Sequence, residues 1–396
     1  MSAGAATRDQ VREDVTRRRG GLLDLSHRIH AHPEVAWEEE RASEWVGQAM
    51  ADGGFAVTPG AYGLSTAVEA VRGDGPLTIV LCAEYAALPG VGHACGHNVI
   101  AASSVGAALA LGAVADKLGI RVVLLGTPAE EGGGGKIELL SRGAFADTHL
   151  ALMAHPGPVD VARAEAYAVS HLKVSYEGKA AHAAAYPEVG VNASDAFTVA
   201  QVALALLRQQ LPVDARVHGI VTHGGDAANI IPAHTEGHWY VRGTTTSQLE
   251  EVEQRAHRCF EAGAVATGCT LAIAPGSPPY AEFANDADVL ARYVSNAQEL
   301  GRTFAAPDDP AGRMNRASTD MGNVSQKVPA IHPYIGIDSL PAVNHQPEFA
   351  AAAASPAADA AVVDAAMALA LTVVDVASDT HQRERLLAGS ARETHA

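Results

Sequence analysis

Leu77-Thr-Ile-Val-Leu-Cys82 is the stretch of sequence that decides the fold. It is a continuous apolar run of strand length, which is typical of a strand buried on both faces of a sheet. Two similar runs follow, Arg121-Val-Val-Leu-Leu125 and His149-Leu-Ala-Leu-Met153, and helix-like stretches at residues 101–118 and 136–143 separate the three. This alternation predicts an α/β fold with a mainly parallel sheet covered by helices.

Polar side chains follow each predicted strand. Glu84, Cys95 and His97 come after the first run, Glu130 and Glu131 after the second, and His155 at the end of the third. Because ligands of open α/β sheets gather outside the carboxyl ends of the strands, we expect these side chains to converge. Each has an ordinary alternative when taken alone. A buried cysteine is often a small apolar residue, an acid pair can be a solvated turn, and a histidine can belong to the core.

A further histidine, His345, completes a set of metal-ligand types. Thiolate, imidazole and carboxylate groups are the ligands that zinc prefers. The set is large enough for two ions that share a bridging ligand: Cys95, His97, Glu131, His155 and His345. Glu130 would then face a bound water, as a general base does. The glycine run at 132–135 is not a phosphate loop, because the Walker pattern requires glycine where Glu130 stands.

The predicted secondary-structure pattern changes after about residue 169. His171-Leu-Lys-Val-Ser-Tyr176 alternates like a half-exposed antiparallel strand. The pattern that follows is strand-helix-strand-strand-helix-strand, with an apolar-periodic helix at 193–208, which predicts a small ferredoxin-like α+β domain. After about residue 282 the α/β pattern returns, with a predicted strand at 330–337 and a last helix that begins with Ser355 as N-cap and Pro356 at the first helical position. We therefore expect a discontinuous metal-binding catalytic domain at residues 1–168 and 282–396, with an inserted domain at 169–281.

Three polar residues of the insert are candidate substrate contacts. His182 lies in Gly178-Lys-Ala-Ala-His182, Asn229 precedes Ile-Ile-Pro232, and Arg242 follows soon after. Arginine is a planar, permanently charged clamp for a carboxylate, and asparagine can donate beside it. A surface salt bridge and a turn asparagine remain alternatives.

Composition and charge exclude several classes of protein. The 396 residues are 48% hydrophobic and 18% charged, and the formal net charge of −17 argues against nucleic acid as a partner. The four cysteines are too few for a disulfide framework, and residues 1–19 lack the apolar core of a signal peptide. The stretch 100–115 is too short and too rich in alanine to cross a membrane. We expect a soluble cytoplasmic protein that acts on a small molecule.

The motifs together resemble the M20 metallopeptidase and amidohydrolase family, in its His-Ala-Cys-Gly-His branch, nearly from end to end. Within that family, the subgroup of aminobenzoyl-glutamate hydrolase and β-alanyl-lysine dipeptidase-like proteins is most similar. The resemblance is carried by His30-Ala-His32-Pro33-Glu34, Glu84-Tyr85, His93-Ala-Cys-Gly-His97-Asn98, Pro128-Ala-Glu130-Glu131-Gly, His155-Pro-Gly-Pro, Gly178-Lys-Ala-Ala-His182-Ala, Gly224-Gly-Asp-Ala-Ala-Asn229-Ile-Ile-Pro232, Arg242, Ser318-Thr-Asp320-Met-Gly-Asn323-Val-Ser325 and His345.

The resemblance implies a role for each candidate. The metal-ligand positions match Cys95, His97, Glu131, His155 and His345, with Cys95 in the bridging place. Glu130 matches the general base, and His182 matches a histidine that reaches a neighbouring active site and stabilises the oxyanion. Asn229 and Arg242 match groups that hold the substrate carboxylate. The resemblance also implies a homodimer through the inserted domain and two divalent ions, zinc first, with manganese, cobalt or nickel as alternatives.

Two positions depart from the family pattern, and Ala86 is the more consequential. Ala86 stands where the resemblance expects an aspartate beside the metals, and Ala317 stands where a glycine commonly precedes Ser-Thr-Asp. Loss of such a supporting acid typically costs 10–100-fold in metal affinity or activity. Ala86 is therefore either a natural weakening or a deliberate inactivation.

We expect a metal-dependent amidohydrolase that cleaves an N-acyl amino acid or a dipeptide with a free carboxylate. A metal-binding pseudoenzyme, or a non-catalytic subunit of a heteromeric amidohydrolase, is the rival that Ala86 favours. A redox protein using Cys82 and Cys95 is a poor alternative, because the sequence has no Cys-x-x-Cys pair.

Overall fold

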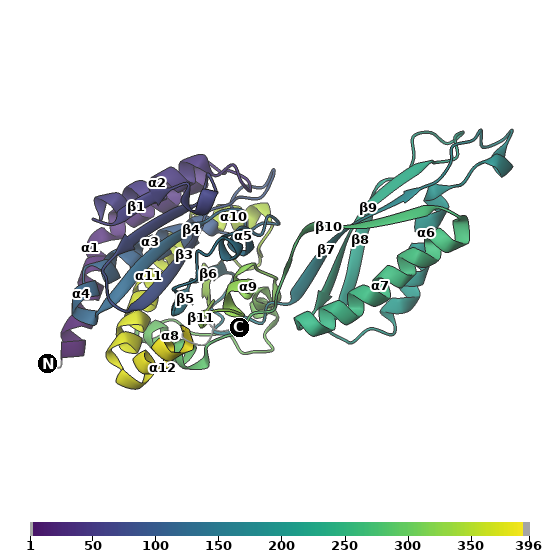
Figure 1. Ribbon diagram of the computed structural model, residues 1–396. Helices are drawn as coiled ribbons and strands as arrows, with labels where there is room; N and C mark the ends of the chain where they lie inside the picture. Colours follow the sequence, from purple (N-terminus) through teal and green to yellow (C-terminus); the bar gives the residue numbers. More distant parts are fainter. Residues whose placement is uncertain (1–2, 391–396) are drawn as a thin grey trace. The chain divides into compact units, whose positions relative to one another are not determined.

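The structure is a computed structural model that describes residues 3–390 of the chain (Figure 1). The chain divides into two compact units, and each is described by itself. Unit 1 comprises Met1–Glu165 and Phe283–Ala396, and unit 2 comprises Ala166–Glu282.

Unit 1 is built on the predicted parallel sheet. Strands β4, β3, β5 and β11 run parallel, while β1 and β2 extend one edge in antiparallel pairing. A separate two-stranded parallel sheet joins β12 to β6. The strands, in sheet order, are β1 (Ala56–Pro59), β2 (Val68–Arg72), β4 (Ile120–Thr127), β3 (Leu77–Glu84), β5 (Leu150–Leu152) and β11 (Ala330–Ile331), with β6 (His155–Gly157) and β12 (Tyr334–Gly336) apart.

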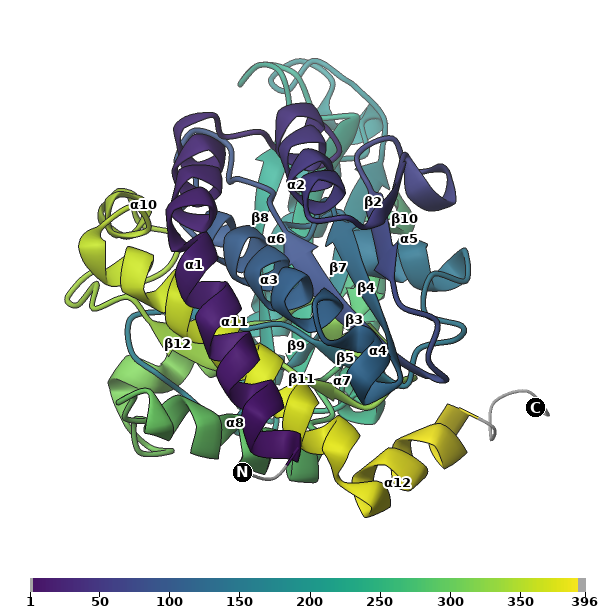
Figure 2. The same ribbon diagram turned by 90° about the vertical axis from the view of Figure 1, so that its left-hand side faces the viewer.

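Helices cover this sheet. Figure 2 shows α1, α3 and α11 side by side, and α3 packs directly on β3 and β4. Every residue of α3 is buried, as expected of a helix that is apolar on all sides. The helices of unit 1 are α1 (Ala3–Ala31), α2 (Glu40–Asp52), α3 (His97–Gly112), α4 (Ala115–Leu118), α5 (Gly135–Ser141), α8 (Ala287–Glu299), α9 (Met321–Ser325), α10 (Pro347–Ala352), α11 (Pro356–Ser378) and α12 (Thr380–Ser390).

One helix of the described chain, α11, is long and apolar enough to cross a membrane by length and composition. Of its most apolar window, 78% is buried inside the protein. Ser355 caps its first turn by accepting a hydrogen bond from the Ala358 N–H at 3.3 Å, and Pro356 occupies the first helical position. This start confirms the cap expected from the sequence.

Unit 2 is a four-stranded antiparallel sheet with two helices. The strand order β10-β7-β9-β8 and the succession strand-helix-strand-strand-helix-strand are the ferredoxin-like arrangement. The elements are β7 (Ala168–Glu177), α6 (Ala193–Arg208), β8 (Arg216–His223), β9 (His234–Gly243), α7 (Thr246–Thr267) and β10 (Thr270–Tyr280). The helices bury one face of the sheet in a core of its own around Trp239, Phe260 and Tyr176.

Two sequence expectations were wrong in detail. The single strand expected at 330–337 is two short strands in different sheets, β11 and β12. Pro333 lies between them and has no N–H for a ladder, while its carbonyl accepts a hydrogen bond from the His155 N–H at 2.9 Å. The helix expected at 101–118 instead begins at His97 and ends at Gly112, with α4 as a separate short helix.

Candidate metal centre

The loop before α3 places a thiol and an imidazole side by side. Gly96, between Cys95 and His97, has φ 77°, a left-handed conformation that favours glycine. A Cβ on Gly96 would also lie 2.5 Å from the Pro156 Cγ atom. Any larger residue would therefore push this loop away from the β6 segment, which carries His155.

The turn after β4 presents two acids. Ala129 holds φ 55°, a strained value for a residue with a Cβ, directly before Glu130 and Glu131. The Glu39 Oε1 atom accepts a hydrogen bond from the Ala129 N–H at 2.7 Å. A Cβ on Gly135 would lie 1.8 Å from the Pro128 carbonyl oxygen, so the glycine run permits a turn this tight. Backbone strain of this kind persists only where the surroundings hold it in place.

Two histidines complete the site. The Nδ1 atom of His155 lies 2.8 Å from the Pro156 carbonyl oxygen, and its Nε2 atom lies 3.6 Å from the Cys95 Sγ atom. An Nδ1–H held by a carbonyl leaves Nε2 with its lone pair, which is the form that ligates metals. His345 has φ 71°, and its Nε2 atom lies 3.7 Å from Glu131 Oε1.

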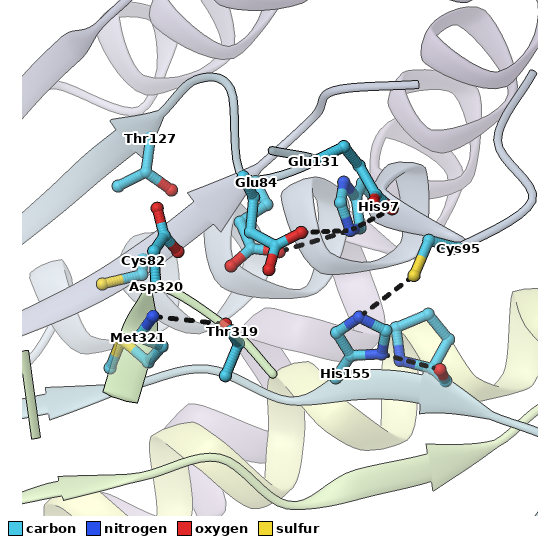
Figure 3. A network of polar contacts seen from close by, with 12 residues as sticks. Cys82, Glu84, Cys95, His97, Thr127, Glu131, His155, Thr319, Asp320 and Met321 are labelled. Carbon is cyan, nitrogen blue, oxygen red and sulfur yellow. Dashed lines mark hydrogen bonds and ion pairs between the residues drawn. The ribbon is translucent and has the colours of Figure 1, made fainter. Parts of the chain in front are cut away.

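The structure brings all five predicted ligands and Glu130 together. The His97 Nε2 atom lies 3.7 Å from Glu130 Oε2 and 3.8 Å from Glu131 Oε1. Figure 3 shows Cys95 facing His155, and His97 facing Glu131 and Glu84. Among residues 3–390, three groups have ligand atoms within 4.8 Å of one another: Cys95, His97 and His155; Cys95, Glu131 and His345; and Glu84, His97 and Glu130.

The electrostatics of this site fit a bound cation. Burial lowers the pKa values of His97 and His155, so both imidazoles are neutral and able to ligate. Burial, and then the neighbouring acids, raise the pKa values of Cys95 and Glu130. A buried excess of negative groups is costly unless positive charge is supplied, and a divalent ion supplies it. The donor set of sulfur, nitrogen and oxygen also suits zinc and similar ions.

Three fully buried residues beside this site, Glu84, Lys136 and Asp320, were given no ligand or catalytic role from the sequence, although Glu84 was expected among the converging polar side chains. Lys136 forms ion pairs with Glu84 at 2.5 Å and with Asp320 at 2.7 Å. Burial lowers the pKa of Lys136, but Asp320 and Glu84 outweigh this effect, so the pKa ends above its usual value. Glu84 at a strand end and Lys136 after the glycine run were visible in the sequence. Their contact was not, because it depends on tertiary packing.

His332 is also missing from the sequence prediction. Its ring stacks on that of His155, with centroids 5.5 Å apart, and both residues are buried. Burial lowers the pKa of His332 to about 3, so the imidazole is neutral. It follows β11 directly, and the sequence motif Ile-His-Pro was the only available signal.

Two of the candidate residues of unit 2 lie close together. His182 forms an isolated β-bridge with Ile230, and the Asn229 carbonyl accepts a hydrogen bond from the Ala183 N–H at 3.0 Å. Both His182 and Asn229 lie at the surface of unit 2. The segments that carry them lie beyond the His234 end of β9, because Gly178 N–H bonds to the Ala233 carbonyl at 2.7 Å.

The third candidate, Arg242, lies at the other end of β9. It is eight residues from His234, roughly 26 Å at ~3.3 Å per residue. Its Nε atom lies 3.4 Å from His218 Nε2, and its guanidinium lies 5.9 Å from the Tyr240 ring centroid. Burial lowers the pKa of Arg242, although arginine stays charged. The structure therefore does not bring Arg242 together with His182 and Asn229 within one chain.

Comparison with known proteins identifies relatives. The model of peptidase family M20/M25/M40 matches residues 70–369. The chain is 41% identical over 373 residues to the Xaa-Arg dipeptidase of Mus musculus, covering 89% of this chain and 84% of the mouse protein. It is 30% identical over 277 residues to one of the chains of p-aminobenzoyl-glutamate hydrolase from Escherichia coli, covering 63% and 56%. A putative aminohydrolase from methicillin-resistant Staphylococcus aureus shares the fold, with TM-score 0.77, 19% identity and coverage of 93% and 99%.

Proposed function

The chain belongs to peptidase family M20/M25/M40, and we propose that it is a metal-dependent dipeptidase for dipeptides whose C-terminal residue carries a basic side chain and a free carboxylate. Its relatives are hydrolases of dipeptides and acyl amino acids. The observation that carries the proposal is the convergence of three ligand groups around His97 and Cys95, next to Glu130.

The choice of a basic side chain rests on similarity and charge. The mouse relative, 41% identical, is a dipeptidase for Xaa-Arg. The chain itself has a formal net charge of −17, which favours the approach of a cationic substrate. An N-acyl amino acid is the second candidate, since a carboxylate clamp at Arg242 would serve either substrate.

We propose that the site binds two divalent ions, with zinc as the first expectation and manganese, cobalt or nickel as alternatives. The residues that would hold them are Cys95, His97, Glu131, His155 and His345. When bound, such ions polarise the amide carbonyl and lower the pKa of water. Cys95 and His97 each belong to two of the three ligand groups. Of the two, only a thiolate sulfur has lone pairs for two ions, which supports a bridging place for Cys95.

The chain's own residues would carry the proton and the substrate. Glu130 Oε2 takes a proton from the attacking water and returns it to the nitrogen of the leaving amine. Its raised pKa, caused by burial and by the neighbouring acids Glu84 and Glu131, suits it to hold that proton. His182 would stabilise the oxyanion, and Asn229 and Arg242 would bind the carboxylate.

We further propose a homodimer through unit 2. A dipeptide is on the order of 7 Å long when extended, whereas Arg242 lies roughly 26 Å along β9 from the end near His182 and Asn229. One substrate can therefore touch all three residues only if they come from two chains.

We also propose that the protein works in the cytoplasm. The four free cysteines support this, because thiols stay reduced there.

A metal-replacement assay tests the proposed function. The protein is stripped with a chelator, reloaded with zinc, manganese, cobalt or nickel, and assayed with Ala-Arg, Ala-Lys, Ala-Glu and N-acetyl-arginine. We expect hydrolysis only after reloading and the highest kcat/KM for the two basic dipeptides. Full activity in the stripped protein would overturn the metal mechanism, and equal rates on Ala-Glu would overturn the basic preference.

The carboxylate clamp has its own test. Arg242→Ala should raise KM for the dipeptides about 10-fold or more, because a charge-assisted bidentate contact is lost. Arg216→Ala is the matched control, since Arg216 pairs with Arg242 across the sheet but binds the backbone carbonyls of Val213 and Ala215. An unchanged KM in Arg242→Ala removes this assignment.

A further inference from the structure

Glu84 is a fully buried carboxylate whose two oxygens have different surroundings. Its Oε1 atom lies 2.5 Å from Lys136 Nζ. Lys136 Nζ also lies 2.7 Å from Asp320 Oδ1, and the Lys136 backbone N–H donates to Asp320 Oδ2 at 2.8 Å. All three side chains have no exposed surface. Lys136 and Asp320 thus fix the direction of the Glu84 carboxylate.

The second oxygen of Glu84 faces the metal centre. Glu84 Oε2 lies 3.4 Å from His97 Nε2. Figure 3 shows the two side chains facing each other. Neither atom has a hydrogen-bond partner among the residues that the structure describes, and both are buried. Burying a nitrogen and an oxygen without partners costs free energy, so a bound group normally satisfies both atoms.

The spacing of the two atoms fits a shared cation. Zinc binds nitrogen and carboxylate oxygen at about 2.0–2.2 Å, so two ligands at a tetrahedral angle stand about 3.4 Å apart. Glu130 Oε2, at 3.7 Å from the same nitrogen, completes a group of three potential ligands.

The charge balance also argues against a purely structural ion pair. Lys136 supplies one positive charge to two buried carboxylates, Glu84 and Asp320. The trio keeps one excess negative charge in a place without solvent, which is unfavourable by itself. A cation on the Glu84 Oε2 side would offset that charge.

We propose that Glu84 is an additional metal ligand for the ion held by His97, and that Lys136 and Asp320 are positioning residues that aim its Oε2 atom. This inference rests on the metal centre of the proposed function. It adds a ligand beyond the five expected from the sequence, and it gives a role to the buried lysine that follows the glycine run.

Metal binding by Glu84→Gln tests the ligand role, because the amide keeps the shape and removes the charge. Protein is equilibrated with zinc in graded chelator buffers, and bound zinc per chain is measured by mass spectrometry. We expect the unchanged chain to bind two ions and Glu84→Gln to bind one of them at least about 10-fold more weakly. Glu138→Gln, at a partly exposed acid on α5 that pairs with Arg142, is the control and should bind both ions normally.

Each remaining outcome has a separate meaning. Normal binding of both ions by Glu84→Gln overturns the ligand role and leaves the metal centre intact. Absence of zinc from the unchanged chain overturns the metal centre, and this inference with it. Thermal unfolding in excess chelator checks folding without metal. If Glu84→Gln is unfolded there, Glu84→Asp replaces it, and its shorter carboxylate should also weaken one ion.

The positioning role has its own variant. Lys136→Met with Asp320→Asn removes one positive and one negative charge together and leaves Glu84 in place. We expect weaker binding of the same ion that Glu84→Gln loses, together with a smaller rise in Tm on adding zinc. A lower Tm in chelator with unchanged zinc affinity would show a merely structural role and would overturn this part of the proposal.

Discussion

Ala86 is the more consequential of the two residues at which this chain departs from the family pattern, and it lies beside the metal centre. It is buried, and its backbone carbonyl acts on the His97 imidazole. The Nδ1 atom of His97 has no side-chain partner among the described residues. Ligating histidines usually donate their second N–H to a carboxylate or carbonyl, which fixes the ring. An acid at position 86 would offer this ring a charged acceptor, which holds a ligating imidazole more strongly than the backbone carbonyl of Ala86 does.

Ala86→Asp should therefore strengthen the site. We expect metal affinity or kcat/KM to rise by about 10–100-fold, the range that supporting acids typically contribute. Zinc competition with a chromogenic chelator measures the affinity, and the dipeptide panel measures the rate. If both stay unchanged while the variant is folded and loaded, Ala86 is not an impairment, and the family pattern does not apply at this position.

Glu130 separates catalysis from metal binding at the residue scale. Glu130→Gln should lower kcat by about 10²–10⁴-fold, the usual contribution of a general acid–base group. Its neighbour Glu131, by contrast, is a predicted ligand, so Glu131→Gln should lose metal as well as activity. Zinc content measured beside kcat tells the two apart. A Glu130→Gln variant that keeps more than a tenth of the unchanged kcat would remove the base assignment.

At the scale of elements, the strands and their ends were predictable, while the contacts behind them were not. The run at 77–82 lies in β3, and α6 begins and ends as its apolar period indicates. Continuous apolar runs and strict periods are local signals, and the parallel arrangement makes their polar ends meet. The two antiparallel strands at one side of the sheet, the edge strand β1 and its neighbour β2, are short and only partly apolar, so they carry no such signal.

In the candidate site, too, some contacts could be predicted from the sequence and others depend on tertiary packing. Cys95, His97 and Glu131 are close in space because each follows a strand of one sheet, which a sequence can indicate. The ion pairs of Lys136 with Glu84 and Asp320 join residues up to 184 positions apart. No local pattern specifies that contact, and a buried lysine between two acids looks in sequence like any surface charge.

The segment before α2 gives a prediction about pH and stability. Burial raises the pKa of Glu39 to about 6, above the 4.5 of an ordinary glutamate. As pH rises, the unfolded chain therefore releases this proton at a lower pH than the folded chain does. The free energy of unfolding falls between about pH 4.5 and about pH 6 as a result. The loss reaches ~2 kcal/mol above that window, since one pKa unit is about 1.4 kcal/mol.

Glu39→Gln should remove this dependence. The amide oxygen can still accept the hydrogen bond from Ala129, so the turn before Glu130 is kept. We expect the variant to be more stable than the unchanged chain at pH 7 by up to ~2 kcal/mol, and equal to it near pH 4. Thermal unfolding at both pH values, with the exposed Glu38→Gln as control, measures the difference. If the variant and the unchanged chain are equally stable at pH 7, the charge of Glu39 does not destabilise the folded protein.

At the scale of the whole molecule, unit 2 carries apolar residues that its own core does not use. Val202 and Leu206 of α6 are 57% and 68% exposed, and Ile220 of the edge strand β8 is 65% exposed. Unpaired edge strands and exposed apolar residues are typical of surfaces that associate. A second copy of the chain is the partner that the proposed active site also requires.

Leu206→Glu with Ile220→Lys should accordingly convert a dimer into a monomer. Each change places a charge on one of the two elements, α6 and β8, whose exposed apolar residues are offered for contact between copies. Analytical ultracentrifugation measures the mass, and the dipeptide assay should fall with it, because His182 and Asn229 would no longer reach a neighbouring site. Val265→Glu is the control, since Val265 is 84% exposed on α7, away from β8. A double variant that stays dimeric excludes this surface.

Complementation between two inactive variants tests the shared site directly. Glu130→Gln lacks the base, and His182→Ala lacks the proposed oxyanion group, so each alone should be nearly inactive. In a mixed dimer, the chain with Glu130 can receive His182 from its partner, which makes one of its two sites whole. Random reassociation of equal amounts should therefore restore about a quarter of the unchanged activity. If each site takes both residues from one chain, mixing restores nothing, and His182 acts within its own chain or not at all.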